Sequence, residues 1–217
     1  MRSNEKFMGL MFAIVLAVIA VASSSTAQES VKLPVPQTSG GMPLMEALAK
    51  RQSIRSYSGQ AISQQLLSDL LWAAFGINRP ESGDHTAPSW RGSKETDIYV
   101  ATAGGVWLYN PKAHDLRRHM AEDIRSKTSS MAFAGSAPVV LIYVADLTRM
   151  AKAAREEQLL NAHVDAAIVG QNVYLFSASA GLGTVIMGSV DREGLPKRLG
   201  LRNDQIVTFA QTVGFPK

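Results

Sequence analysis

Apolar residues return at helical spacing in three stretches of the chain. Leucines recur every three or four positions across residues 63–76, where Ser63 is a suitable N-cap and Gly76 a suitable stop. A shorter stretch with the same spacing covers residues 43–50. The longest covers about residues 155–180. Its second half is apolar on nearly every side, which predicts burial at the domain centre or against another subunit.

Runs of β-branched and aromatic residues predict strands. The run at residues 139–145 is apolar throughout, which is typical of a buried central strand. Weaker patterns predict two short helices, one at residues 121–127 and one capped by Asp191. Helices and strands follow no regular alternation, so the predicted fold class is α+β, with a mainly antiparallel central sheet flanked by helices. The other strands are expected at residues 97–102, 106–109, 114–118, 184–187 and 206–213.

The N-terminal residues have the pattern of a secretory signal peptide. Arg2 and Lys6 precede a short apolar run, and small residues follow, so we expect cleavage after Ala27 and an exported protein, periplasmic or secreted. The alternative is an uncleaved anchor, although the run is shorter than the roughly 20 residues that span a bilayer. Residues 28–42, with prolines, glycines and little periodicity, predict a flexible leader. The folded domain is therefore expected at residues 43–217, without stable membrane insertion once the signal peptide is removed.

Composition narrows the function. The 217 residues are 46% hydrophobic, enough for one domain with a sizeable core. Removing residues 1–27 lowers the net charge from +4 to +3, which is too mild to indicate nucleic-acid binding. The absence of cysteine excludes disulfides, thiolate catalysis and cysteine metal sites. The four histidines show no ligand spacing, so no metal site is expected, and no catalytic side chain is apparent.

Three segments carry candidate chemistry. Arg51 and Arg55 flank Ser53 just after a predicted helix, and guanidinium forks suit phosphate; the alternative is a solvated basic helix end. Residues 88–94 lie in a long polar loop, residues 79–95, where Arg91 and Lys94 offer cations and small residues allow close approach; the alternative is a plain surface loop.

The third segment, residues 181–188, contains glycines that could be taken for a dinucleotide fingerprint, but the helix and the strand around them are in the wrong order. That fingerprint runs from a strand into a helix, whereas here a helix precedes the glycines and a strand follows. A Rossmann fold is therefore rejected.

Taken in order, these segments resemble the nitroreductase family over about residues 43–216. The nearest branch is the compact one that includes the oxidases of thiazoline- and oxazoline-containing peptides. The resemblance is carried by residues 50–57 (KRQSIRSY), 70–79 (LLWAAFGINR), 86–89 (TAPS), 97–100 (DIYV), 137–138 (AP), 171–172 (QN), 181–184 (GLGT) and 213–216 (VGFP).

The resemblance implies a nitroreductase-like fold and a homodimer with FMN bound at the subunit interface, each site drawing on both chains. In the family, the first segment holds the flavin phosphate and ribityl chain, which here means Arg51, Ser53 and Arg55, with Gln52 where a basic residue is commoner.

The other implied contacts concern the flavin ring. Pro88 and Ser89 match a loop that supplies groups to the ring, often from the partner subunit. Family members usually have Asn where Gly92 stands and Gln where Lys94 stands. We expect Lys94 to supply the hydrogen bond to the flavin ring in their place. Met187 and Gly188 are expected nearest the reactive nitrogen, with backbone N–H groups toward the reduced flavin, and the terminal Lys217 is a further candidate for the phosphate.

The expected function is an FMN-dependent oxidoreductase that takes a hydride from NAD(P)H and reduces nitroaromatics, quinones or similar small molecules in a ping-pong cycle. Two alternatives stay open. One is an exported flavin dehydrogenase or oxidase acting on a peptide or small molecule, because nicotinamides are scarce outside the cytoplasm. The other is a flavin-binding module without turnover.

Overall fold

The computed structural model describes residues 29–150 and 152–217, so the predicted signal peptide at residues 1–27 lies outside the described residues. In the described part, one seven-stranded sheet dominates, and every pair of neighbouring strands in it is antiparallel. This confirms the predicted α+β class. In sheet order the strands are β1 (Ser30–Lys32), β6 (Asp115–Met120), β5 (Gly105–Asn110), β4 (Thr96–Thr102), β7 (Val139–Asp146), β9 (Gln205–Gly214) and β8 (Gly183–Met187).

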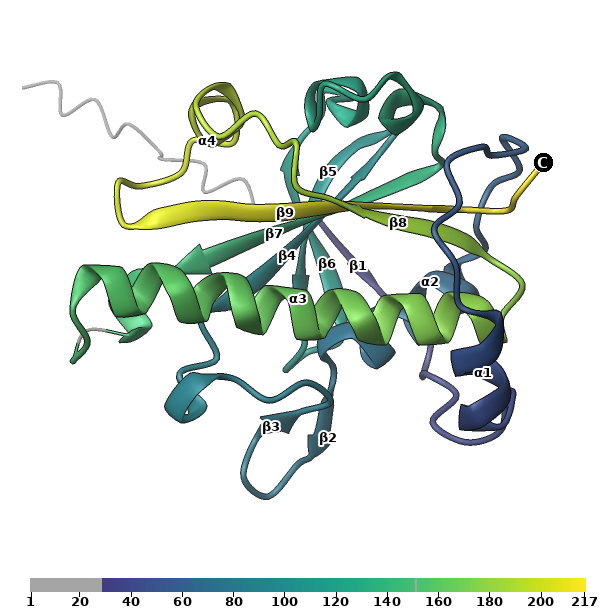
Figure 1. The fold of residues 1–217 in the computed structure, drawn as a ribbon, viewed down its shortest axis with the longest axis horizontal. Coiled ribbons are helices and arrows are strands. Elements are labelled where there is room, and N and C mark those ends of the chain that lie inside the picture. The colour runs from purple at the N-terminus through teal and green to yellow at the C-terminus, as the bar shows by residue number, and fades with distance from the viewer. Residues whose placement is uncertain (1–28, 151) are drawn as a thin grey trace, which may run out of the picture.

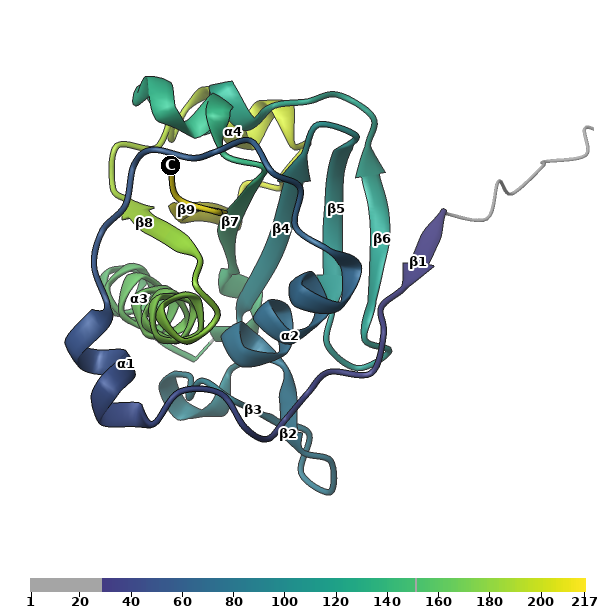
Figure 2. The same cartoon turned by 90° about the vertical axis from the view of Figure 1, so that its right-hand side faces the viewer.

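Helices cover both faces of the sheet (Figures 1 and 2). Two of them, α2 and α3, lie on one face, with α1 beside the C-terminal end of α3, whereas α4 lies on the other face. The smaller elements include a short hairpin and four 3-10 helices, and no helix in the described ranges has the length and hydropathy needed to cross a bilayer. The helices are α1 (Leu44–Lys50), α2 (Gln64–Phe75), α3 (Arg155–Ser179) and α4 (Gly194–Arg198); the hairpin strands are β2 (Ile77–Arg79) and β3 (Asp84–His85).

Strand β7 is the centre of the core. All eight of its residues are buried. Because side chains alternate along a strand, Leu141 and Tyr143 pack on the α2 and α3 face while Val140 and Ile142 pack on the other. The unbroken apolar run in the sequence therefore belongs to a strand that is covered on both sides, as predicted.

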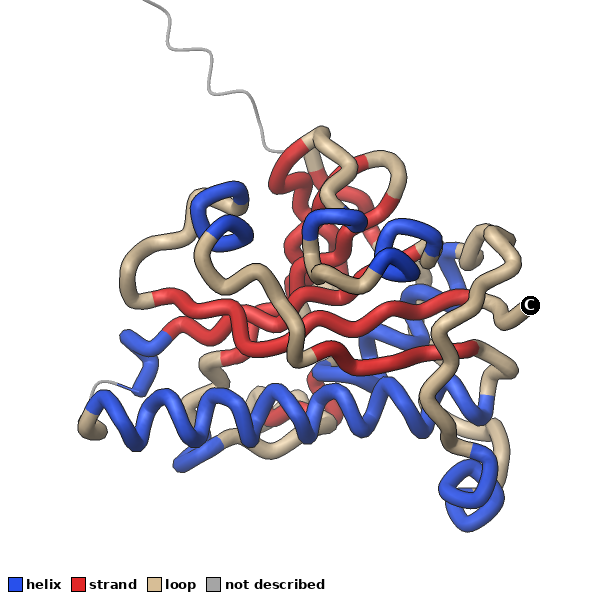
Figure 3. Tube along the Cα trace, turned by 45° about the horizontal axis from the view of Figure 1, so that its top comes forward, coloured by secondary structure: helices blue, strands red, loops and turns tan. Residues whose placement is uncertain are grey.

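Helix α3 runs along the sheet beside the edge strand β8 (Figures 1 and 3). It approaches closely at Gly170, where a Cβ atom would lie 2.7 Å from the side chain of Ile186. Part of its opposite side is exposed among the described residues, where Leu160 is 64% and Val164 46% exposed. One side of this apolar helix is thus buried at the domain centre, and part of the other is exposed.

In the stretch predicted as a leader, residues 28–42, the described part begins at residue 29 and contains a strand. Strand β1 pairs with β6, and Leu33 is buried. Ser68 Oγ donates a hydrogen bond to Pro34 O at 2.6 Å, and the backbone N–H of Gln37 donates to Asp69 at 2.8 Å. Figure 2 shows this segment crossing from the β1 edge past α2 to α1. Strand pairing and anchoring on α2 fix a segment whose own sequence has no periodic pattern.

The helix predicted at residues 121–127 is wrong; only Arg125–Lys127 forms a 3-10 turn. The side chain of Asp123 accepts hydrogen bonds from the backbone N–H and the guanidinium of Arg125. Such local side-chain bonding competes with helix formation. The short helix expected after Asp191 does form, and Asp191 Oδ1 accepts from the backbone N–H of Gly194 at 2.8 Å.

Replacing Ser68 by Ala should destabilise the protein by about 1–3 kcal/mol, because it leaves buried polar groups unpaired. Ser68 is fully buried, and its hydroxyl bonds both Pro34 O and His114 Nε2, each at 2.6 Å. Urea denaturation measures the loss. The control is Ser130→Ala, an exposed serine whose hydroxyl bonds no group in the described ranges, which should change stability by less than about 0.5 kcal/mol. Equal stability of the two variants would contradict this anchoring role.

Candidate functional site

The segment that follows α1 docks against the free edge of the sheet. Ser53 forms a bridge with Thr184 of β8, and the backbone N–H of Ile54 donates to Thr184 O at 3.0 Å. The approach is close at Gly183, where a Cβ atom would lie 2.7 Å from the side chain of Ile54. Glycine at position 183 therefore allows the segment carrying Arg51 and Ser53 to lie on β8.

Tyr174 of α3 connects this segment to the strand. Its hydroxyl lies 2.9 Å from Ser53 Oγ and accepts a hydrogen bond from the backbone N–H of Ile186 at 3.1 Å. The guanidinium of Arg51 lies over the same ring, 5.3 Å from its centre, in a cation–π contact. One phenol thus positions both Arg51 and Ser53.

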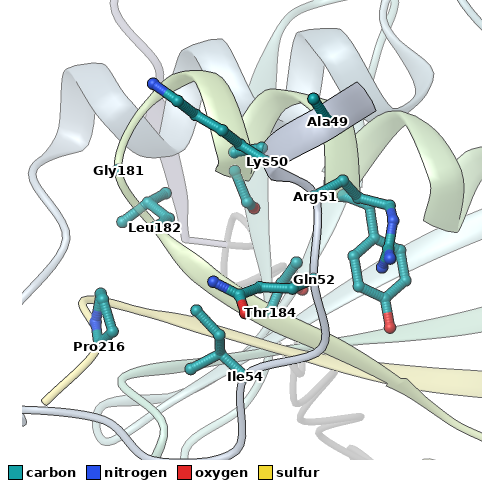
Figure 4. A pocket seen from close by; sticks show the side chains of 12 residues that line it. Ala49, Lys50, Arg51, Gln52, Ile54, Gly181, Leu182, Thr184 and Pro216 are labelled. Atoms are coloured by element: carbon teal, nitrogen blue, oxygen red, sulfur yellow. The ribbon is translucent and has the colours of Figure 1, made fainter. Parts of the chain in front are cut away.

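A pocket of about 420 Å³ opens between α1, the end of α3 and β8. Figure 4 shows Lys50, Arg51 and Gln52 around it, with Thr184 behind. No carboxylate or imidazole lines it among the described residues. The polar side chains of its wall are Lys50, Arg51, Gln52, Tyr174, Ser177 and Thr184.

The basic side chains near β8 differ in whether they form an ion pair. Lys50 is paired with Glu46 at 2.7 Å. Arg51 and Arg55 form no ion pair within residues 29–150 and 152–217. The buried Ser177 Oγ, at the pocket wall, has no hydrogen-bond partner in the same part of the chain. Positive charge and a spare hydroxyl without an acidic partner suit a phosphate or another anion.

Ser53 and Arg55 themselves are outside the lining of this pocket. The hydroxyl of Ser53 is bonded to Tyr174, and Arg55 is exposed, two residues from the buried Tyr57. The structure therefore brings Arg51, Gln52 and Ser53 together at the β8 edge and leaves Arg55 beside them at the surface.

Met187 and Gly188 lie at the far end of β8. Met187 is buried and pairs with Ala210 of β9. The carbonyl of Gly188 accepts a hydrogen bond from Arg192 at 2.8 Å, and a Cβ atom on Gly188 would meet open space. The chain is therefore exposed at Gly188, just beyond the end of β8.

The loop of residues 88–94 lies elsewhere on the chain. The backbone N–H of Trp90 donates to Asp165 Oδ2 at 2.6 Å, and Asp165 lies nine residues before Tyr174 on α3, about 13 Å along the helix axis. Within one chain, Pro88, Ser89, Gly92 and Lys94 are thus separated from Arg51.

This loop is more ordered than a plain polar connection. The long loop of residues 79–95 contains β3 and a 3-10 turn, Trp90–Gly92, and Ser89 Oγ accepts from the backbone N–H of Lys94 at 2.9 Å. The ammonium group of Lys94 binds Asp84 at 3.0 Å. Hydrogen bonds from Ser82 and Lys94 lower the pKa of Asp84 to about 2. Lys94, which was expected to contact the flavin ring, is therefore ion-paired with Asp84 of the β2–β3 hairpin within this chain.

Sequence reasoning missed Tyr174, because an aromatic residue in an apolar helix is usually core. The only signal is its hydroxyl, which needs a partner when the ring is buried. No group of three histidine or acidic side chains that would hold a metal ion occurs in the described ranges.

The model of the nitroreductase family matches residues 48–215. The chain belongs to the nitroreductase family. MJ1384 from Methanocaldococcus jannaschii, which is named as a nitroreductase, is 33% identical over 156 residues, covering 67% of this chain and 78% of the relative.

Solved structures agree with this assignment. One from Ralstonia eutropha JMP134, also named as a nitroreductase, is 38% identical with a TM-score of 0.84, and covers 88% of this chain and 91% of that one. The NADPH:FMN oxidoreductase of Vibrio harveyi, at 22% identity and a TM-score of 0.62, covers 80% of this chain and 69% of its own, and shows the shared fold alone.

Membership of the nitroreductase family makes the chain a flavin-dependent oxidoreductase, as the sequence predicted. The fold is the nitroreductase-like fold that the resemblance implied. Its placement in the compact peptide-oxidase branch stays a prediction.

Replacing Tyr174 by Phe should destabilise this nitroreductase by about 1–3 kcal/mol, because Ser53 and the Ile186 N–H lose their partner. Urea denaturation measures the change. Tyr99→Phe is the matched control: its ring is similarly buried, and its hydroxyl bonds no group in the described part of the chain. If the two variants lose the same stability, the phenol of Tyr174 does not hold the segment.

Proposed function

We propose that this protein is an exported FMN-dependent oxidoreductase that uses NADH or NADPH to reduce nitroaromatic, quinone or similar acceptors. The observation that carries the proposal is the guanidinium of Arg51, which forms no ion pair with any described residue and is fixed beside Ser53 by Tyr174 at the edge strand β8. The signal-peptide pattern in residues 1–27 supports export.

The residues present fit the phosphate end of FMN. Arg51 supplies a planar fork, Ser53 a hydroxyl, and Arg55 a second guanidinium without an acidic partner in the described ranges. The phosphate dianion would replace the missing carboxylate as their counter-charge. Ser177, buried and unbonded at the neighbouring pocket wall, offers a further donor on the same side of α3.

The ring contacts follow from the course of β8. Gly188 directly follows β8, four residues beyond Thr184 and about 13 Å further along the sheet edge. Gly188 is exposed, and a Cβ atom there would meet open space. Met187 and Gly188 would hold the reactive part of the cofactor, with N–H groups able to stabilise developing negative charge.

A homodimer accounts for the separate position of the Pro88–Lys94 loop. Within one chain this loop is far from Arg51, so its contribution to a site would come from the partner subunit. The exposed apolar side chains on α3, Leu160 and Val164, and on α1, Leu44 and Met45, support a subunit interface.

When bound, FMN would supply two-electron redox chemistry between NAD(P)H and the acceptor. The residues of this chain would bind the phosphate and hold the ring along β8. No acid side chain lines the pocket within the described residues, so we propose solvent as the proton source.

Export also favours a second candidate, a flavin dehydrogenase that oxidises a peptide or small molecule and passes electrons to oxygen or another acceptor. Anaerobic mixing of residues 28–217, loaded with FMN, with NADH or NADPH separates the two. Rapid bleaching of the flavin spectrum is the result expected for the reductase. Slow bleaching that needs another donor would favour the dehydrogenase, and no bleaching by any donor would leave a binding module.

Changing Arg51 or Arg55 to Ala should weaken FMN binding by about 10–150-fold each, since a hydrogen bond to a charged group is worth about 1.5–3 kcal/mol. Quenching of flavin fluorescence gives the dissociation constants. Arg117→Ala is the control, because Arg117 pairs with Asp115 on β6, away from the β8 edge, and should leave FMN binding unchanged. FMN uptake that survives both arginine substitutions would refute the assigned phosphate site.

A further inference from the structure

Arg192 connects the loop that follows β8 to strand β9. Its guanidinium donates from Nη1 to Gly188 O at 2.8 Å and from Nη2 to Thr208 O at 2.9 Å. It forms no ion pair with the residues that the structure describes. The side chain is therefore engaged with two carbonyl groups of the main chain rather than with an acid.

The carbonyl that accepts the second bond belongs to an irregular point of β9. Strand β8 ends at Met187, so Thr208 lies beyond the last pair between these two strands. On the side of β7, Thr208 is the extra residue of a β-bulge, because consecutive residues of β7 pair with Phe209 and Val207. The bulge disrupts the ladder locally, and the carbonyl of its extra residue binds Arg192.

The N–H group of Gly188 points away from β9. Along a paired strand, successive N–H groups point alternately to its two edges. The N–H of Ile186 points to the outer edge of β8, where it donates to Tyr174. Gly188 directly follows the strand, two residues later, so its N–H points to the same edge. This N–H donates to no group in the described part of the chain.

Arg192 turns the next N–H to the same side. The peptide bond between Gly188 and Ser189 is trans, so its carbonyl and its N–H point in opposite directions. Because Arg192 holds the carbonyl on the β9 side, the N–H of Ser189 points away from β9. In a regular strand this N–H would point back toward β9. It, too, donates to no group among residues 29–150 and 152–217.

A second segment holds the loop by the following carbonyl. The backbone N–H of Ser130 donates to Ser189 O at 3.4 Å, and the hydroxyls of Ser129 and Ser189 lie 3.0 Å apart. Ser129 also forms a bridge with Val190. The carbonyls of Gly188 and Ser189 therefore both have donors, whereas the N–H groups of these two exposed residues have no partner in the described ranges.

Two adjacent N–H groups on one side of the chain suit negative charge. We propose that Arg192 is a positioning residue, which turns the Ser189 N–H beside that of Gly188 so that both face the flavin ring and favour its reduced form. The orientation of the loop depends only on contacts within this chain. Its effect on the flavin rests on the proposed function, in which the ring lies at Met187 and Gly188.

The preference for the reduced form has an electrostatic cause. Reduction by two electrons increases the negative charge of the ring system, and fixed N–H donors aimed at developing charge stabilise it. The guanidinium binds the carbonyl of the same peptide that presents the Ser189 N–H, and hydrogen bonds in such a chain strengthen one another. The positive charge of Arg192 acts in the same direction.

Backbone order in the full chain, without added flavin, tests the positioning directly. In the unaltered protein the Ser189 amide should have an NMR order parameter near about 0.85, the value of rigid backbone. In Arg192→Met the Gly188 carbonyl loses its attachment to β9. The order parameter of the Ser189 amide should then fall below about 0.6.

The reduction potential of bound FMN tests the consequence. Loss of the fixed Ser189 N–H in Arg192→Met should decrease the preference for reduced over oxidised flavin about tenfold, which lowers the midpoint potential by about 30 mV for a two-electron couple. Arg192→Lys keeps the positive charge but lacks the fork that reaches two carbonyls. It should therefore lower the potential as Arg192→Met does.

Arg198→Met is the matched control. Arg198 lies on α4 and pairs with Glu122 at 3.0 Å, so the same substitution there leaves the contacts of Gly188 intact. Its order parameter and potential should equal those of the unaltered protein. An unchanged order parameter or an unchanged potential in Arg192→Met would overturn the proposal. Full retention of the potential in Arg192→Lys would also overturn it, because charge alone would then be sufficient.

FMN binding keeps this proposal separate from the proposed function. If the Ser189 amide loses order in Arg192→Met but the unaltered protein does not bind FMN, the orientation by Arg192 stands and the proposed function fails. If FMN binds and Arg192→Met changes neither the order parameter nor the potential, the proposed function stands and the role of Arg192 fails.

Discussion

The docking of residues 53–57 on the edge of the sheet fixes the position of the candidate site. Tyr57 donates a hydrogen bond to Ile54 O at 2.7 Å and lies 2.5 Å from Thr212 Oγ1 in β9. Burial raises the pKa of Tyr57 to about 12, so the phenol keeps its proton at neutral pH. Because Tyr57 and the Ser53–Tyr174 bond hold the segment at both ends, the direction in which Arg51 points is set by the fold rather than by a free loop.

The sequence predicts best those elements in which the spacing of apolar residues matches the side of the backbone that is buried. The leucines of α2 and the apolar run of β7 face the core at the period of their own backbone. Contacts distant in sequence are harder to predict. Within residues 29–42, β1 pairs with β6 and Ser68 bonds Pro34 O, and nothing in the local composition indicates either contact.

The site residues also differ in how far the sequence indicates them. Arg51 and Ser53 are candidates from the sequence because a guanidinium and a hydroxyl, both suited to phosphate, lie two residues apart. The role of Tyr174 is not, because its partners Ser53 and Ile186 come from separate segments that meet only in the fold. Family membership supplies the flavin chemistry, and the fold places Arg51, Gln52 and Ser53 together beside β8.

The central claim is that the guanidinium groups beside β8 bind the phosphate of the cofactor. A comparison of the dissociation constants for FMN and riboflavin tests it most directly, because the two ligands differ only by that phosphate. The account predicts that FMN binds at least about 100-fold more tightly, the equivalent of two charge-assisted contacts at about 1.5 kcal/mol each. Riboflavin binding as tightly as FMN would contradict it.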